Sequence, residues 1–169
     1  IIAEQLEHIK SEELTDRLES FLGNPKYDPH GDPIPNKEGN IEKTIANAQV
    51  VLDRENIEYE RFEVPGALEV PLACQYLAQT NRYNGMVALG AVIRGETAHF
   101  DHVCEQSARG IMNVSLEQNI PIGNGIITVK NEKQALARAS VDESLGKENK
   151  GKEAAQAAVA LMRLRRDIK

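Results

Sequence analysis

Residues 86–104 read M-V-A-L-G-A-V-I-R-G-E-T-A-H-F-D-H-V-C and decide the fold. The first eight residues predict a buried strand over Met86–Ile93, and a helical pattern begins near Asp101. Open α/β sheets bind ligands where the carboxyl end of a strand leads into a helix. The free amides at such a helix end favour an anion, particularly a phosphate. His99 lies in this loop and can move a proton near neutral pH, so the sequence predicts a phosphate site beside a proton-transfer residue.

The rest of the chain after residue 40 alternates between the helical and the strand period. Such alternation predicts a parallel sheet with helices on both faces, a three-layer α/β/α domain over residues 41–169. The first helix should bury Ile45, Ala48, Val51 and Leu52. Helices are predicted over residues 41–55, 68–77, 101–118, 132–139 and 152–166, and strands over residues 59–64, 86–93 and 125–129.

Residues 1–40 form a separate segment in this interpretation. Residues 1–22 carry apolar side chains at helical spacing, and residues 23–40 contain four prolines and three glycines. Proline excludes both a helix interior and a central strand, so the second part is expected to be a linker or an extended arm.

The composition of the 169-residue chain is that of a soluble globular protein, with 41% hydrophobic and 27% charged residues. A net charge of −6 argues against a nucleic-acid surface. No apolar run approaches the roughly 20 residues that span a bilayer, and the charged first segment is unlike a signal peptide. Cys74 and Cys104 lack metal-ligand spacing and are expected to be free thiols in a reducing cytoplasm.

Three segments next to the predicted strands contain residues that could bind a ligand. All three segments should lie at the same edge of the sheet. In the first, Glu69 could accept hydrogen bonds from a planar heterocycle or simply complement the helix dipole. In the second, Gly95 and Thr97 could bind phosphate or merely form a turn and cap, and Arg94 could be a surface ion-pair partner. His102, further along the helix, is expected to face solvent or to pack.

The third segment is Gly123-Asn124-Gly125, which is predicted to be a turn before a strand. Glycine in such a turn usually indicates a positive φ angle. Arg138 and Lys150 are cations that suit a phosphate, although either one alone reads as an ordinary surface charge.

Four stretches of the chain resemble lumazine synthases (6,7-dimethyl-8-ribityllumazine synthases). The similarity runs from about Val51 to the C-terminus, and the spaced motifs occur in the family's order. They are V-P-G-A-L-E-V-P-L-A (64–73), A-L-G-A-V-I-R-G-E-T-A-H-F-D-H-V (88–103), S-A-R-G-I-M-N-V-S-L-E (107–117) and N-K-G-K-E-A-A (149–155).

This resemblance implies a flavodoxin-like fold and a cofactor-free transferase of riboflavin biosynthesis. The enzyme would condense 5-amino-6-(D-ribitylamino)uracil with 3,4-dihydroxy-2-butanone 4-phosphate. The site would lie between subunits of a homo-oligomer, a pentamer or a larger shell. His99 would transfer protons, and Arg138 would hold the phosphate. The substrate-binding residues that the resemblance implies are Ala67, Leu68, Glu69, Ala91, Val92, Ile93, Glu96, Thr97, Asn124, Arg138 and Lys150, of which Asn124, Arg138 and Lys150 would come from the neighbouring subunit.

The sequence departs from the lumazine synthase pattern before residue 41. The family begins with a buried central strand that ends in an aromatic residue stacked on the pyrimidine, and no apolar strand precedes the helix at 41–55 here. Asn124 also stands where many members have an aromatic residue. A gap beside Met86–Ile93 is therefore expected, which brings catalysis into question and leaves an inactive, lumazine synthase-like assembly protein as an alternative.

The first 40 residues resemble the dimerisation region of iron- and manganese-dependent transcriptional repressors. The stretches are A-E-Q-L-E-H-I-K-S-E-E-L-T-D-R-L-E-S-F-L-G (3–23) and D-P-H-G-D-P-I-P (28–35). This resemblance implies metal ligands at Glu4, Glu7 and His8, whose spacing would place them on one helix face. An ordinary solvated face is the competing interpretation. A metal-dependent regulator fragment is thus the second functional alternative, although the DNA-binding domain is missing.

Overall fold

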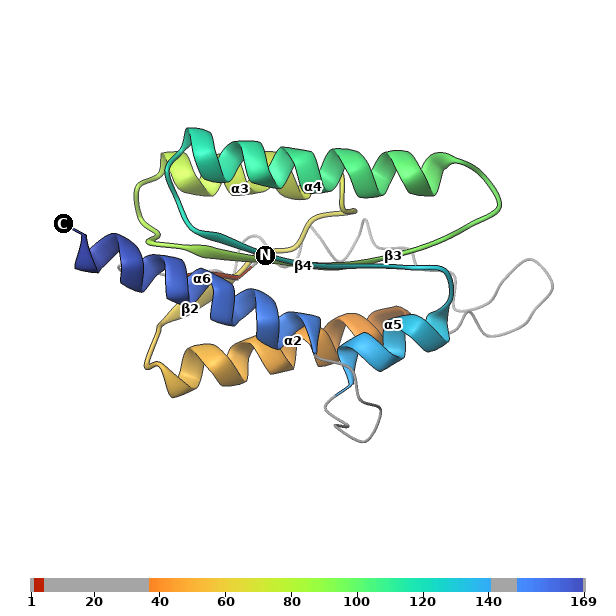
Figure 1. The fold of residues 1–169 in the computed structure, drawn as a ribbon, viewed down its shortest axis with the longest axis horizontal. Helices are drawn as coiled ribbons and strands as arrows, with labels where there is room; N and C mark the ends of the chain where they lie inside the picture. Colours follow the sequence, from red (N-terminus) through yellow and green to blue (C-terminus); the bar gives the residue numbers. More distant parts are fainter. Residues whose placement is uncertain (1, 5–36, 141–148, 169) are drawn as a thin grey trace, which may run out of the picture.

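The computed structural model describes residues 2–4, 37–140 and 149–168, and these form three layers (Figure 1). A four-stranded sheet lies in the middle, with two helices on one face and three on the other. This arrangement confirms the predicted α/β/α architecture. One face carries α3 (Val70–Gln79) and α4 (His99–Glu117), and the other carries α2 (Lys37–Arg54), α5 (Glu132–Ala139) and α6 (Lys150–Asp167).

The strands are β1 (Ile2–Glu4), β2 (Tyr59–Arg61), β3 (Met86–Ile93) and β4 (Ile122–Val129), in the spatial order β2-β1-β3-β4. The last two pair in parallel along their whole length, whereas β1 is antiparallel to both of its neighbours. It follows that β2, β3 and β4 all run in one direction. The sheet is parallel, as predicted, apart from β1.

The strand β1 corrects two expectations about the N-terminus. The predicted helix over residues 1–22 is wrong for Ile2–Glu4, and the rest of that helix and most of the linker lie outside the described residues. The expected linker is wrong for residues 37–40, which form the start of α2. The expected gap beside β3 is filled in part, because Ile2 lies opposite Val87 and Ala3 opposite Met86. Buried backbone groups need partners, and an extended segment can supply them in either direction.

Within the described residues, β1 fills only part of the gap beside β3. β3 pairs with β4 over eight residues, from Met86 opposite Ile122 to Ile93 opposite Val129. Its ladder with β1 covers only Met86 and Val87. The carboxyl half of β3, which leads to the predicted site, therefore has no ladder partner from the described residues on that side.

Side chains of β3 alternate between two cores, as the period of a strand requires. Met86 and Ala88 pack with the cluster formed under α3 and α4, which includes Cys74. Val87 and Leu89 pack with the cluster formed under α2 and α6. The second cluster also contains four side chains of α2 that the helical period predicted to face inward. All four are buried: Ile45, Ala48, Val51 and Leu52.

The segment Gly123-Asn124-Gly125 lies inside β4, so the predicted turn is wrong. The glycines are explained by close packing against α6. A Cβ atom on Gly123 would lie 1.9 Å from the carbonyl oxygen of Ala154, and one on Gly125 would lie 2.9 Å from the Ala154 Cβ. These glycines let a helix approach the strand backbone.

Most of the remaining boundaries shift by a few residues from those predicted. β2 ends at Arg61, three residues early, while α4 begins at His99, two residues early. The strand β3 and the helix α5 have the predicted bounds. Among the described residues, no helix has the length and apolarity that a membrane crossing requires.

Candidate functional site

The loop after β3 places His99 at the amino end of α4. His99 is the first residue of this 19-residue helix and is exposed, as are Glu96 and Thr97 in the loop. The His99 backbone amide donates a long hydrogen bond, 3.4 Å, to Thr97 Oγ1. The N-cap residue Ala98 offers no capping side chain, and the Asp101 amide donates to the Ala98 carbonyl oxygen at 3.0 Å. An anion would be favoured at the positive end of this helix.

Arg94 is bound within its own chain. Its Nη2 donates to Asp101 Oδ1 at 2.5 Å, and its guanidinium lies 4.8 Å from the centroid of the Phe100 ring. The alternative prediction of an ion-pair role for Arg94 is thereby confirmed. The partner could not be named from the sequence, because a separation of seven residues across a loop follows no helical or strand period.

The end of β3 supplies the next three candidates, all of them half-buried. Ala91 and Ile93 pack against the cluster under α5, which contains Ile127 and Val129. Strand alternation therefore turns Val92 toward the opposite face, where α4 begins. Of these three residues, Val92 shares a face of the sheet with His99.

The first candidate loop ends at Glu69, the N-cap of α3, whose side chain makes no capping hydrogen bond. Pro71 in the first turn of α3 lies beside Gly110 of α4, where a Cβ would approach it to 2.6 Å. Gly110 follows His99 by eleven residues, roughly 16 Å of helix. Glu69 and His99 thus lie on the same face of the sheet but about three helical turns apart.

Arg138 and Lys150 lie across the sheet from His99. They belong to α5 and α6, which cover the face opposite α4 (Figure 1). Lys150 Nζ pairs with the Glu153 carboxylate, and Arg138 Nη1 reaches the Gln134 carbonyl oxygen at 3.5 Å. A single chain therefore does not bring these two cations to His99.

Asn124 is exposed on the edge strand β4, opposite Ala88. Its Oδ1 accepts a hydrogen bond from the Ile126 amide at 3.1 Å. Five residues separate it from Val129, about 16 Å along a strand. Asn124 thus lies away from the carboxyl edge at which His99 is placed.

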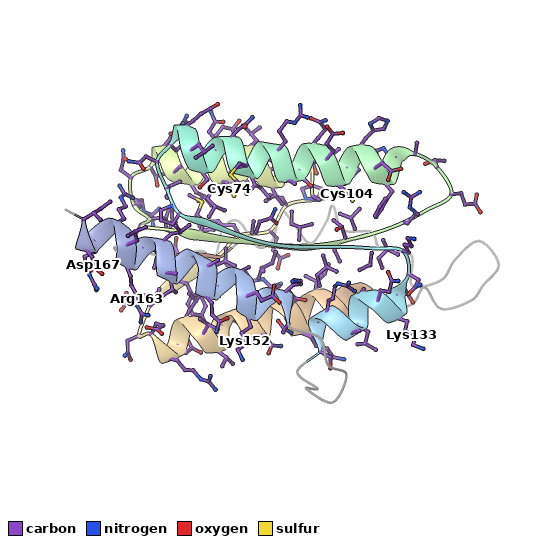
Figure 2. All side chains as sticks on the ribbon, in the orientation of Figure 1. Cys74, Cys104, Lys133, Lys152, Arg163 and Asp167 are labelled. Carbon is purple, nitrogen blue, oxygen red and sulfur yellow. The ribbon has the colours of Figure 1, made fainter. Side chains whose placement is uncertain are left out.

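The two cysteines are free thiols, with Cys74 buried between α3 and the sheet and Cys104 partly buried in α4 (Figure 2). Burial raises the pKa of Cys74 to about 11. Burial also raises the pKa of Cys104; Asp101 adds to this effect and Arg94 opposes it. Both residues are thus packing residues rather than activated nucleophiles.

The metal candidates are not brought together on a helix. Glu4 belongs to the strand β1, so the predicted helix face of three ligands is wrong at this residue, and Glu7 and His8 lie outside the described residues. In the part of the chain that the structure describes, no group of three or more His, Cys, Asp or Glu side chains could hold a metal ion.

Comparison with known protein families gives two matches that adjoin along the chain. Residues 38–166 match the model of 6,7-dimethyl-8-ribityllumazine synthase. Residues 1–36 match the metal binding and dimerisation domain of iron dependent repressors. Both resemblances noted in the sequence are confirmed.

Individual relatives agree with the larger match. A 6,7-dimethyl-8-ribityllumazine synthase of Methylobacterium radiotolerans is 45% identical over 125 residues, which cover 74% of each chain. One of Erythrobacter litoralis is 48% identical, covering 71% of this chain and 82% of its own. One of Sphingopyxis alaskensis is 53% identical, covering 68% and 77%. Identity at this level over so much of the sequence places the chain in the 6,7-dimethyl-8-ribityllumazine synthase family.

Proposed function

We propose that this chain is a lumazine synthase that condenses 5-amino-6-(D-ribitylamino)uracil with 3,4-dihydroxy-2-butanone 4-phosphate. The observation that carries the proposal is the position of His99. In a chain of this family, the loop G-E-T-A leaves the carboxyl end of β3 and sets His99 as the first residue of α4. A proton carrier and a phosphate-binding helix end then share one loop.

The chemistry suits these residue types. The amine attacks the ketone, water leaves to give an imine, phosphate is eliminated, and the second amine closes the ring with loss of a second water. Each stage moves a proton near neutral pH, which one imidazole can do. The amides at the start of α4, with Glu96 and Thr97 beside them, would stabilise phosphate as the leaving group. Holding two substrates in one orientation would supply much of the remaining rate.

The spacing of the other residues fits an elongated first substrate. Val92 would line the substrate pocket with its side chain. Ala91 and Ile93 would do so with their backbone, because their side chains pack under α5. Ala67 to Glu69 would contact the uracil and ribityl parts. The three-turn offset between Glu69 and His99 supports this arrangement, since a ring with a ribityl chain is long enough to contact both regions.

Arg138, Lys150 and Asn124 would come from a neighbouring subunit. The proposal is supported by their separation from His99 within one chain. It is also supported by exposed apolar side chains along the outer surface of α3 and α4, because such a patch marks an interaction surface. We propose a pentamer or a larger shell in the cytoplasm. The exposed residues are Leu72 (50%), Tyr76 (61%), Met112 (59%) and Leu116 (72%).

The oligomer is tested by light scattering. Tyr76→Glu places a charge in this apolar surface and is expected to reduce the assembly to smaller species. Val50→Glu, at a 45% exposed position on α2 in the opposite layer, is the matched control. A wild-type protein that scatters as a monomer would contradict the shared site.

The activity is tested by following lumazine absorbance from the two substrates. His99→Ala should lower kcat by about 100-fold, within the usual range for losing an acid–base group. His102→Ala, an exposed histidine of the same helix, should not. Arg138→Ala should raise KM for the phosphorylated butanone, whereas Lys133→Ala, on the outside of the same helix in Figure 2, should leave it unchanged. Absence of product from the wild type would overturn the proposal and favour the inactive assembly protein.

A second function is supported only for residues 1–36, by their match to a metal binding and dimerisation domain. Calorimetric titration with Mn²⁺ tests it, with Glu7→Gln and His8→Ala as variants. Heat that persists unchanged in both variants would exclude these side chains as ligands.

A further inference from the structure

The loop that carries His99 receives little support from packing. Its residues from Arg94 to His99 are exposed, and a Cβ atom on Gly95 would meet nothing within 4 Å. The helix that follows begins without a side-chain cap. The shape of this loop must therefore depend on how its two ends are held.

Both ends of the loop are held through Arg94. Its backbone amide donates to the Val129 carbonyl oxygen at 2.9 Å, which joins the start of the loop to the end of β4. Its side chain reaches across the loop to Asp101 at 2.5 Å and lies over the ring of Phe100. One residue thus ties the end of the sheet to the first turn of α4, with the four loop residues between.

We infer that Arg94 and Asp101 form a clamp that fixes loop 95–98 and the direction of His99 during the reaction. The inference rests on the proposed function, for which it names two positioning residues. Neither needs to contact substrate. Asp101 also complements the positive end of the helix dipole, so its carboxylate serves both the helix and the guanidinium.

Loss of the Arg94–Asp101 ion pair should lower the turnover rate more than it lowers the stability of the fold. The two side chains are 42% and 56% exposed, and exposed ion pairs contribute little to the free energy of unfolding. A catalytic group displaced by about 1 Å can nonetheless cost up to 100-fold in rate. Loss of the clamp is therefore expected to lower kcat by about 5- to 10-fold while KM changes little.

The kinetic test is a double-mutant cycle of Arg94→Ala and Asp101→Ala, assayed as the assembled enzyme. Each single variant should lose the same factor in kcat, and the double variant should lose no more than either. The matched control is the Glu105–Arg109 ion pair of the same helix, with a 2.7 Å contact and similar exposure. Its alanine variants should keep wild-type turnover. An effect of Arg94→Ala on phosphate-substrate affinity, with Asp101→Ala unaffected, would overturn the clamp in favour of direct phosphate binding by Arg94.

Hydrogen exchange supplies a readout that does not depend on activity. The backbone amides of His99, Asp101 and His102, which donate to Thr97 Oγ1 or to the Ala98 carbonyl oxygen, should exchange faster in both clamp variants and at the wild-type rate in Arg109→Ala. Unchanged exchange in Arg94→Ala would overturn the clamp, whatever the activity. If the wild type makes no lumazine, the proposed function fails, and this comparison still decides whether the clamp exists.

Discussion

Gly123 of β4 faces the backbone carbonyl of Ala154 in α6 so closely that a Cβ atom would lie 1.9 Å from the oxygen. Gly123→Ala must therefore push α6 off the sheet. We expect the free energy of unfolding to fall by about 3 kcal/mol or more, because the obstacle is backbone and cannot change rotamer. The urea midpoint measures this loss.

The control for this substitution is Gly90→Ala in β3. The nearest atom to a Cβ there is Ile126 Cγ1 at 3.8 Å, an ordinary contact. Its midpoint should stay close to wild type or rise slightly, since alanine restricts the unfolded chain. Equal losses in the two variants would show that close helix packing is not the reason for the glycine at 123.

The buried thiol of Cys74 predicts how stability responds to alkaline pH. Its pKa is about 11 in the folded protein, whereas the thiol of the unfolded chain ionises near its ordinary pKa of 9.0. Between these pH values the unfolded state loses the proton first, so stability falls as pH rises, by at most about 2–3 kcal/mol. Tyr83, whose pKa burial raises to about 12, adds a fall above pH 10.

Urea unfolding between pH 8 and pH 11 checks this slope. Cys74→Ala creates a small cavity and lowers stability throughout, but its stability should fall less steeply between pH 9 and pH 11. A slope identical to that of the wild type would mean that Cys74 titrates alike in both states.

The reactivity of Cys104 depends on the charges beside the loop that carries His99. Asp101 raises its thiol pKa and Arg94 lowers it, although burial is the main cause of the raised value. Since the thiolate is the reactive form, Arg94→Ala should shift the pH midpoint of Cys104 alkylation upward, and Asp101→Ala should shift it downward. Mass spectrometry of the labelled peptide separates Cys104 from the buried Cys74. Shifts of the same sign in both variants would contradict the charge assignment.

The short strand β1 can be tested by substitution of Ala3, which lies between Glu60 and Met86 in the sheet. Ala3→Pro removes a backbone donor from an inner strand and should lower the free energy of unfolding by roughly 3 kcal/mol. Ala3→Val keeps the donor and favours extended backbone, so it should be neutral. If proline is tolerated as well as valine, β1 contributes nothing to the sheet.

The segment from Met86 to Glu117 could be predicted from the sequence because local signals agree there. An apolar run, a glycine-containing loop and a helical period all indicate the same architecture. The helical period likewise predicted α5. The burial of Ile45 and Val51 followed from the same helical period. The resemblance then assigned roles to His99 and Arg138 that periodicity alone could not.

The failures have a common physical origin in contacts between distant segments. Gly123 and Gly125 looked like a turn because only the approach of α6, some thirty residues later, explains them within a strand. Ile2–Glu4 became a strand because β3 offers backbone groups that need partners, which no local pattern reveals. The separation of Arg138 from His99 likewise depends on which face of the sheet each helix covers.

The reversed direction of β1 has a practical consequence for labelling this protein. Because Ile2 lies opposite Val87 and Ala3 opposite Met86, the strand runs from the carboxyl edge of the sheet toward the amino edge. Any affinity tag or fluorophore attached ahead of Ile2 is therefore directed along β3 toward the edge that holds His99. The exposed end of α6 is the safer attachment point, since Ile168 lies there with 76% of its surface free.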